Sequence, residues 1–170
     1  MKCLRVEDEV LWRTYAARRA EIRKRSVVRA DVKPETAESF QYSATLSLDH
    51  GVNEVWLLHG TSEVAANAIS KGNFIPSTGG CFGAGVYFAD TASKSNGYAK
   101  AAGDGCKIML LCRVVLGNVR VLPKGSDSSA DRFAKDPGVD TILGETNARE
   151  FVVYDATQIY PEYIMYYKES

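Results

Sequence analysis

Apolar and polar positions follow one another along the chain in blocks that predict strands, helices and loops. Residues 54–58 (EVWLL) and 107–115 (KIMLLCRVV) form continuous apolar runs, which are typical of buried strands. Shorter apolar runs at 86–89, 150–155 and 163–167 predict three further strands. The pattern therefore predicts five well-defined strands.

Three segments carry apolar residues at helical spacing. The first runs from about residue 8 to residue 25, among six basic side chains. Its apolar positions are Val10, Leu11, Tyr15 and Ile22. The second follows a tight polar turn at 59–62 and ends at Gly72, and the third covers about 90–100 behind a polar capping residue.

The remaining segments are polar or irregular. Residues 74–85 (FIPSTGGCFGAG) are rich in glycine and predict a loop. A second polar stretch, 124–147, predicts a long loop of the kind that often serves as a binding element. We expect short strands and loops in 26–53, and a turn at 156–161.

Strands outnumber helices and do not alternate regularly with them, which favours an α+β fold with mainly antiparallel sheets. A chain of 170 residues has the size of one domain with one core. We therefore expect a single domain over 1–170, with a helical segment in 1–30 and the core of the domain in 54–168.

Composition removes several classes of function. The chain has 21 basic and 21 acidic side chains, so no overall field attracts a polyanion. No apolar run is long enough to span a membrane, and the N-terminus lacks the pattern of a secretion signal, so we expect an intracellular protein without a membrane partner. Four cysteines without a C-x-x-C pair and only two histidines argue against a metal site.

Common catalytic motifs are missing from the sequence. It contains neither the G-x-S-x-G of esterases nor the phosphate-binding loop of nucleoside triphosphatases. Gly83-Ala84-Gly85 precedes a strand, whereas a dinucleotide fingerprint precedes a helix. What remains is a set of polar and aromatic residues at predicted strand ends and at the start of the third helix: His59, Tyr87, Phe88, Lys94, Ser95, Tyr98 and Glu150.

Four segments around these residues resemble the poly(ADP-ribose) polymerase family of ADP-ribosyltransferases. They are LLHGTS (57–62), GGCFGAGVYFADTASKSNGYA (79–99), MLLCRVVLGN (109–118) and EFVVYDATQIYPEY (150–163). The second is especially similar to the tankyrase type, and the resemblance covers about residues 54–168. It implies a fold of two packed, mainly antiparallel sheets, NAD as co-substrate, and transfer of ADP-ribose to protein acceptors.

The resemblance also implies roles for individual residues. The family's histidine, tyrosine and glutamate fall on His59, Tyr87 and Glu150. His59 would bind the adenosine-side ribose of NAD. The other roles are the carboxamide contacts of Gly60 and Ser95, the nicotinamide stacking of Tyr87 and Tyr98, the pocket wall of Phe88 and Ala89, and the position of Lys94 near the reacting ribose.

Elementary chemistry agrees with these roles. Nicotinamide leaves NAD as a neutral molecule, so its departure needs no general acid, unlike ordinary glycoside cleavage. A single carboxylate, Glu150, could stabilise the positive charge that grows on the sugar, an effect of roughly 3 kcal/mol or more. Two aromatic faces suit a flat cationic ring, at about 0.5–2 kcal/mol each.

Departures from the family shape the remaining expectations. The tankyrase-type zinc-binding insertion is missing before 107–115, and the loop at 74–80 is short and uncharged. Glu150 is compatible with elongation to poly(ADP-ribose), but the loop at 124–147 also decides between a polymer and a single unit. Arginine-specific toxin-like transferases are disfavoured, because Ala148-Arg149 stands where a paired Glu-x-Glu is needed.

Two alternatives stay open at this stage. The domain could bind NAD as a scaffold without turnover, although all three residues of the triad are present. It could also modify nucleic acid ends, for which the basic segment from Arg13 to Arg25 is the only support.

Overall fold

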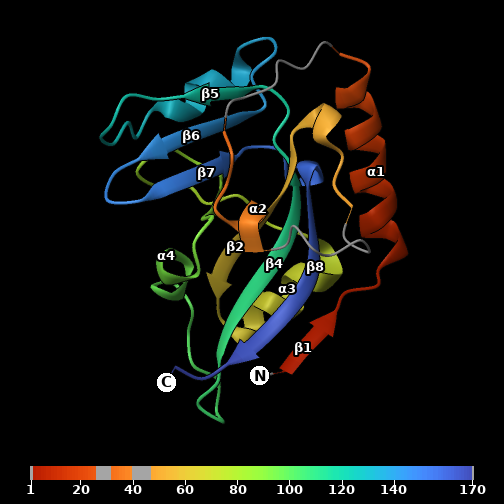
Figure 1. Cartoon of the computed structure of the whole chain (residues 1–170), viewed down its shortest axis with the longest axis vertical. Coiled ribbons are helices and arrows are strands. Elements are labelled where there is room, and N and C mark those ends of the chain that lie inside the picture. Colours follow the sequence, from red (N-terminus) through yellow and green to blue (C-terminus); the bar gives the residue numbers. More distant parts are fainter. Residues whose placement is uncertain (1, 26–31, 40–46, 170) are drawn as a thin grey trace.

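The computed structural model describes residues 2–25, 32–39 and 47–169, which form two four-stranded sheets with flanking helices (Figure 1). The first sheet has the spatial order β1 (Lys2–Arg5), β8 (Ile159–Tyr167), β4 (Lys107–Val115) and β2 (Glu54–Thr61). All its pairings are antiparallel. Eight of the nine residues of β4 are buried because it lies inside the sheet, which explains its unbroken apolar run.

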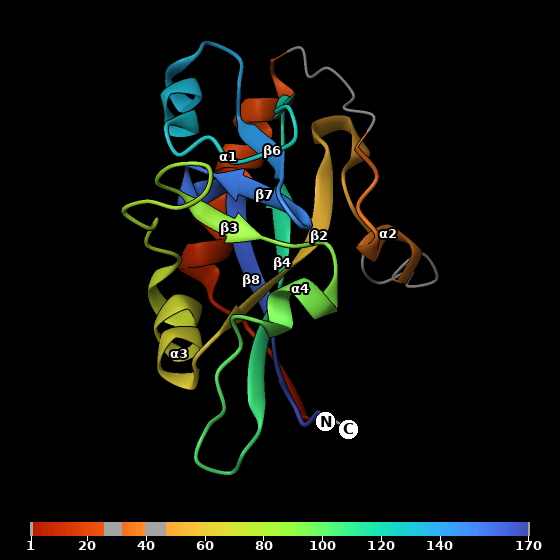
Figure 2. The same ribbon diagram turned by 90° about the vertical axis from the view of Figure 1, so that its left-hand side faces the viewer.

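The second sheet has the order β3 (Val86–Phe88), β7 (Arg149–Val153), β6 (Thr141–Glu145) and β5 (Val119–Val121). Only β5 and β6 are parallel. Figure 2 shows β3 and β7 crossing in front of β4 and β8. The predicted α+β fold with mainly antiparallel sheets is confirmed.

The two sheets share one core and are joined by backbone hydrogen bonds. Leu58 of β2 donates to the carbonyl of Ala89 at 2.8 Å, and Ala89 donates back to Leu58 at 3.0 Å. The core between the sheets contains Leu57, Leu110 and Val114 from the first sheet and Phe88, Leu143, Phe151 and Val153 from the second. The chain thus passes from β3, at the edge of the second sheet, directly to a backbone pairing with β2, at the edge of the first.

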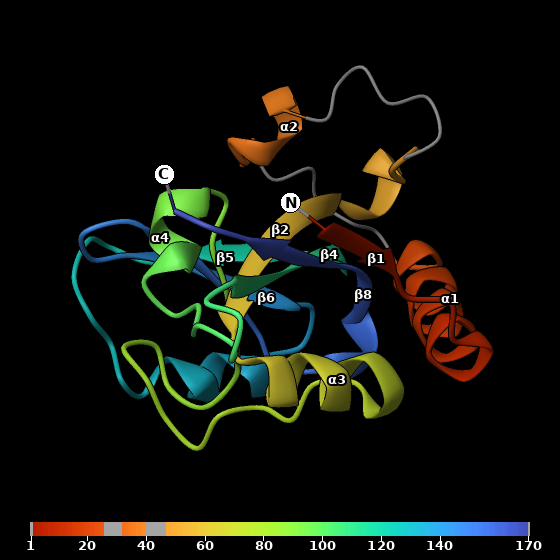
Figure 3. The same cartoon turned by 90° about the horizontal axis from the view of Figure 1, so that it is seen from below.

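Helices cover both faces of the first sheet. Figure 3 shows α3 (Glu63–Gly72) on one face and α2 (Thr36–Ser39) on the other. The long helix α1 (Glu9–Arg23) lies beside β8, and the short α4 (Ala92–Asn96) follows β3. Short 3-10 helices, labelled η, occupy His50–Val52, Ala130–Lys135 and Ala156–Gln158.

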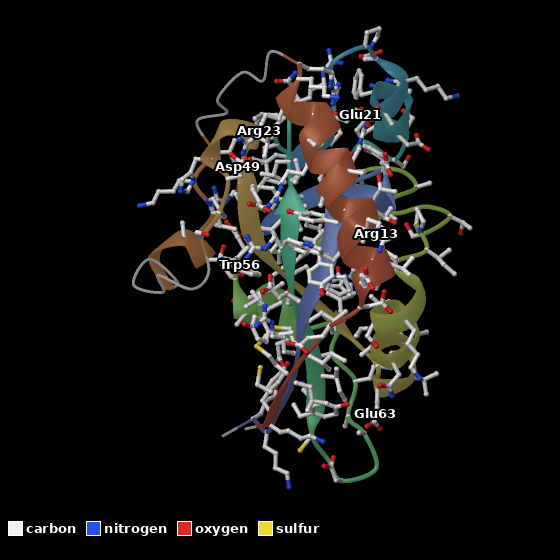
Figure 4. All side chains as sticks on the ribbon, turned by 90° about the vertical axis from the view of Figure 1, so that its right-hand side faces the viewer. Arg13, Glu21, Arg23, Asp49, Trp56 and Glu63 are labelled. Carbon is white, nitrogen blue, oxygen red and sulfur yellow. The ribbon has the colours of Figure 1, made fainter. Side chains whose placement is uncertain are left out.

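Helix α1 confirms the predicted helix at 8–25, but its basic residues are engaged within the molecule. The carboxylate of Asp8 caps the helix by accepting from the backbone N–H of Leu11 at 2.9 Å. Figure 4 shows Arg23 near Asp49, with which it forms an ion pair. Further pairs in α1 are Arg13–Glu9, Arg18–Glu21, Arg18–Asp155 and Arg19–Glu54, and Arg25, just beyond the helix, pairs with Asp140. Of the apolar positions at helical spacing, Leu11, Tyr15 and Ile22 are buried, whereas Val10 is 71% exposed.

Three predicted boundaries are corrected by the structure. Strand β2 continues to Thr61, so no turn interrupts 59–62, and Ser62 caps α3 directly. Helix α4 ends at Asn96 before Gly97, short of Lys100. Strand β8 begins at Ile159 and includes Pro161, because the turn after β7 is completed within 156–158.

The polar segments also contain more order than their composition indicates. Residues 124–147 include both a 3-10 helix at 130–135 and the strand β6, so this segment is not one long loop. In 32–39 and 47–53, the structure has α2 and a 3-10 helix where short strands were expected. The rest of the segment for which short strands and loops were predicted, 26–31 and 40–46, lies outside the described residues.

Candidate active site

One cavity of about 570 Å³ opens where the two sheets meet, between α3, β3 and α4. All nine residues that the sequence indicated as a site belong to its lining: His59, Gly60, Tyr87, Phe88, Ala89, Lys94, Ser95, Tyr98 and Glu150. They come from β2, β3, β7, the helix α4 and the segments that follow β3 and α4. Residues distant in sequence therefore converge as predicted.

His59 is fixed in one tautomer at the wall of this cavity. Its Nδ1 lies 2.8 Å from the backbone carbonyl of Tyr87. A carbonyl oxygen only accepts hydrogen bonds, so Nδ1 carries the proton in the neutral ring and Nε2 is left as an acceptor. Burial lowers the pKa of His59, and the hydrogen bond to Tyr87 offsets only part of this shift. The ring packs edge-on against Phe74.

Gly60 brings bare backbone to the cavity. Since Leu58 bonds to Ala89 on the side of β2 away from β4, Gly60, two residues on, directs its N–H and carbonyl to that same side. A Cβ at position 60 would lie 1.8 Å from the backbone oxygen of Ser95. Only glycine lets α4 approach β2 this closely, and the side chain of Ser95 is buried at the contact.

Tyr87 uses its hydroxyl to hold the glycine-rich loop. This hydroxyl donates to the carbonyl of Gly83 at 2.5 Å and accepts from the N–H of Phe82 at 2.9 Å. Burial, above all, raises the pKa of Tyr87, with the negative charge of Glu150 adding to the shift. The phenol is therefore neutral and its hydroxyl is anchored to the glycine-rich loop, while the residue as a whole lines the cavity.

Glu150 is the carboxylate of the cavity and is paired with a lysine. It is 5% exposed, and its Oε1 lies 3.2 Å from the Nζ of Lys94. Burial lowers the pKa of Lys94, but the hydrogen bond and charge of Glu150 outweigh burial and raise it overall. The Lys94 ammonium also lies 5.6 Å from the ring centroid of Tyr98, which follows α4 and is 58% exposed.

Part of the lining was not identified from the sequence. One wall is apolar and comes from α3 and the segment after it: Ala65, Ala68, Ile69, Phe74 and Ile75. Apolar positions on one face of a helix indicate burial, and the pattern is the same whether that face meets a core or a cavity. Ile75 also lines the cavity, although it is 91% exposed. Nothing in the local sequence indicates that it lies there.

The segment 124–147 contributes no residue to the lining, although all of it is described. It supports the glycine-rich loop instead. The N–H of Asp127 donates to the carbonyl of Cys81 at 2.8 Å. Asp131 packs against Gly83, whose φ of +80° and lack of space both require glycine.

Within the described residues, no group of three or more histidine, cysteine, aspartate or glutamate side chains is placed to hold a metal ion. Nor is any helix in those ranges long and apolar enough to cross a membrane.

The two packed, mainly antiparallel sheets with a cavity at their junction agree with the architecture expected of an ADP-ribosyltransferase catalytic domain. Residues 4–145 match the sequence model of the poly(ADP-ribose) polymerase catalytic domain, and the chain belongs to this family. The predicted family is thus confirmed. The match ends before Glu150, so the role of that residue depends on the geometry described above.

Similar proteins include both polymerases and single-unit transferases. The chain is 28% identical to a tankyrase of Caenorhabditis elegans, over 68% of this chain and 7% of the relative. It is 33% identical to poly(ADP-ribose) polymerase 2-A of Oryza sativa, over 76% and 24% of the two chains. It is 28% identical to the protein mono-ADP-ribosyltransferase PARP12 of Homo sapiens, over 99% and 22%. The chain spans less than a quarter of the length of each of these relatives.

Proposed function

We propose that this domain binds NAD in the cavity at the sheet junction, releases nicotinamide and transfers ADP-ribose to protein acceptors. The observation that carries the proposal is the convergence of His59, Tyr87 and Glu150 on one cavity from three different strands. Membership of the poly(ADP-ribose) polymerase catalytic domain family supports NAD as the co-substrate.

The lining offers a partner for each part of the nicotinamide half of NAD. The backbone of Gly60 and the hydroxyl of Ser95 would bind the carboxamide, since the two residues approach each other closely and both line the cavity. The rings of Tyr87 and Tyr98 would stack on the nicotinamide. Phe88 and Ala89 would complete the wall.

His59 would bind the adenosine-side ribose. Its neutral ring has Nε2 as an acceptor, which can take a hydrogen bond from a ribose hydroxyl. Because Nδ1 is held by the carbonyl of Tyr87, the direction of this acceptor is fixed before NAD arrives. Such preorganisation reduces the entropy lost on binding.

Glu150 would act on the nicotinamide-side ribose. As nicotinamide leaves, positive charge grows on that sugar, and a buried carboxylate stabilises it more strongly than water does. Lys94 would hold the carboxylate of Glu150 in place through the contact at 3.2 Å and lie near the reacting ribose. No general acid is needed for a neutral leaving group.

We further propose that the domain can add more than one ADP-ribose unit. A glutamate at position 150 meets one requirement for elongation. Relatives with names of both kinds, polymerase and mono-ADP-ribosyltransferase, are similar to this chain, so the identity of the products needs a direct assay. Digestion of labelled products to nucleotides would distinguish chains from single units.

Protein acceptors are favoured over nucleic acid ends. The basic segment Arg13–Arg25 was the only feature that pointed to nucleic acid. Five of its six cations form ion pairs with acidic side chains of this chain, which leaves little free positive charge for a phosphate backbone.

The proposed function is tested with NAD labelled in its adenylate part. We expect label to become covalently attached to protein and nicotinamide to be released in the same reaction. Calorimetry with NAD in parallel separates a transferase from a scaffold. NAD binding without labelled protein or released nicotinamide would support the scaffold. If the protein neither binds NAD nor forms these products, the proposal is refuted.

A further inference from the structure

The backbone around Glu150 lies at a fork between the two sheets. Strands β3 and β7 pair antiparallel, with Phe88 opposite Phe151 as the last pair. The ladder stops there because the next residue, Ala89, bonds to Leu58 of the first sheet. At Glu150, therefore, β7 has no partner strand on the side of β3.

An ion pair takes the place of the missing ladder. Continuing the register by two positions places Ala89 opposite Glu150 and Asp90 opposite Arg149. The guanidinium of Arg149 is paired with the carboxylate of Asp90. An apolar pair, Phe88 with Phe151, thus lies on one side of Glu150, and a charged cross-strand pair lies on the other.

This ion pair is embedded in further contacts. Asp90 is 4% exposed and also accepts from the backbone N–H of Glu35 at 3.2 Å. Arg149 donates to the carbonyl of Lys33 at 3.3 and 3.4 Å. A shielded pair with additional hydrogen bonds holds its geometry better than an exposed one.

We propose that Asp90 and Arg149 are positioning residues for Glu150, an inference that rests on the proposed function. Successive residues of a strand point to opposite faces, so Arg149 acts on Glu150 through the backbone of β7 and does not contact the substrate. Strand β6 pairs with Arg149 and Glu150 on one side of β7, and the ion pair holds these residues on the other side, where no β3 backbone does. Releasing it lets the carboxylate of Glu150 drift from the reacting sugar.

The consequence is a defect in turnover rather than in NAD affinity. Misplacement of a reacting group by about 1 Å can reduce a rate about a hundredfold. We expect Arg149→Met to lower kcat by about tenfold or more, while the affinity for NAD measured by calorimetry changes less than about twofold. Arg149→Lys keeps the charge but loses the planar guanidinium that reaches both Asp90 and Lys33. Its kcat should therefore lie between that of the unmodified protein and that of Arg149→Met.

A double-mutant cycle with Glu150 distinguishes positioning from general structural support. If Arg149 acts through Glu150, Arg149→Met should have almost no further effect on nicotinamide release in a Glu150→Gln background. The matched control is Arg120→Met, which removes the exposed ion pair between Arg120, on β5 of the same sheet, and Asp136, and should leave kcat unchanged.

Several results would overturn the proposal. One is unchanged kcat in Arg149→Met, and another is an equal loss of rate with and without the Glu150 carboxylate. Circular dichroism identifies a variant that fails to fold, in which case Arg149→Lys and Asp90→Asn carry the same comparison. Absence of nicotinamide release by the unmodified protein would instead count against the proposed function itself.

Discussion

The Nδ1 of His59 lies 2.8 Å from the backbone carbonyl of Tyr87, so the histidine of β2 is oriented by the strand that carries the tyrosine. This contact lies beside the mutual hydrogen bonds of Leu58 and Ala89, which join the two sheets. The junction that joins the two sheets therefore also orients the imidazole.

The first prediction concerns pH. Burial lowers the pKa of His59 below the ordinary histidine value of 6.5, so the folded protein keeps the ring neutral where an unfolded chain is half protonated. The stability that the neutral His59 ring gives to the folded protein is complete above pH 6.5 and is lost as the pH falls through the lowered pKa. We expect NAD affinity to be constant from about pH 8 down to pH 6.5, where the folded ring is still neutral, and to weaken only as the pH falls further through the lowered pKa, because a protonated Nε2 no longer accepts.

Calorimetry across this range checks the prediction, with two variants as references. His59→Gln should bind NAD more weakly but with the acid-dependent loss removed. His50→Gln changes the chain's other histidine, which is exposed and outside the cavity lining, and should retain the full pH dependence. An acid-dependent loss that survives in His59→Gln would contradict the assignment.

The second prediction is that Glu150→Gln separates catalysis from binding. The amide keeps the size of the side chain but removes the charge that would stabilise the sugar. We expect nicotinamide release to fall by about a hundredfold or more, as when one electrostatic contact to a transition state is removed. NAD affinity should stay within about threefold, because the carboxylate contributes mainly in the transition state. Similar turnover of the variant and the unmodified protein would exclude the proposed role.

The third prediction uses the tight contact between β2 and α4. In Gly60→Ala the new Cβ would lie 1.8 Å from the oxygen of Ser95, so the helix or the strand must move. We expect the free energy of unfolding in urea to fall by about 1–3 kcal/mol, the usual cost of overpacking. NAD binding should also be lost, because the carboxamide site lies at the same contact.

Gly72→Ala is the control for this substitution. Position 72 ends α3, and a Cβ there meets no atom within 4 Å. Alanine is also the better helix former, so this variant should be at least as stable as the unmodified protein. Equal behaviour of the two variants in urea and in calorimetry would contradict the close approach of α4 to β2.

Patterns of apolar residues predicted the strands that are buried in the core. The run at 107–115 matches β4 at both ends, since every position of a central strand is covered. Strand β1 was missed, because its four residues are all exposed at a sheet edge and its order depends on pairing with β8 at the far end of the chain. Strand β6 was missed because it lies within a polar stretch. Its extended conformation depends on pairing with β5 and β7, which the local composition does not indicate.

More of the candidate site than of the fold could be predicted from the sequence. The residue types of the site suit one chemistry and occur in long segments in a fixed order. The contacts that give those residues their geometry could not be predicted. The approach of Gly60 to Ser95 and the support of Gly83 by Asp131 join positions 35 to 48 residues apart, and no local pattern encodes such distances. The tautomer of His59 likewise depends on a carbonyl of another strand.

The last prediction concerns the hydroxyl of Tyr87, which is engaged in hydrogen bonds with the backbone of Gly83 and Phe82. Tyr87→Phe keeps the ring for stacking but releases the glycine-rich loop and leaves the Phe82 N–H without its acceptor. Losing such hydrogen bonds costs about 1 kcal/mol each. We therefore expect the KM for NAD to rise by about three- to tenfold and kcat to stay within about twofold.

Steady-state kinetics of nicotinamide release measures both constants. Tyr163→Phe removes a hydroxyl from β8, outside the cavity lining, and should change neither. A large fall in kcat with unchanged KM in Tyr87→Phe would place the hydroxyl in the chemical step. In that case the tyrosine would act on the reacting groups directly, and the glycine-rich loop would be held chiefly by Asp127 and Asp131 from the segment behind it.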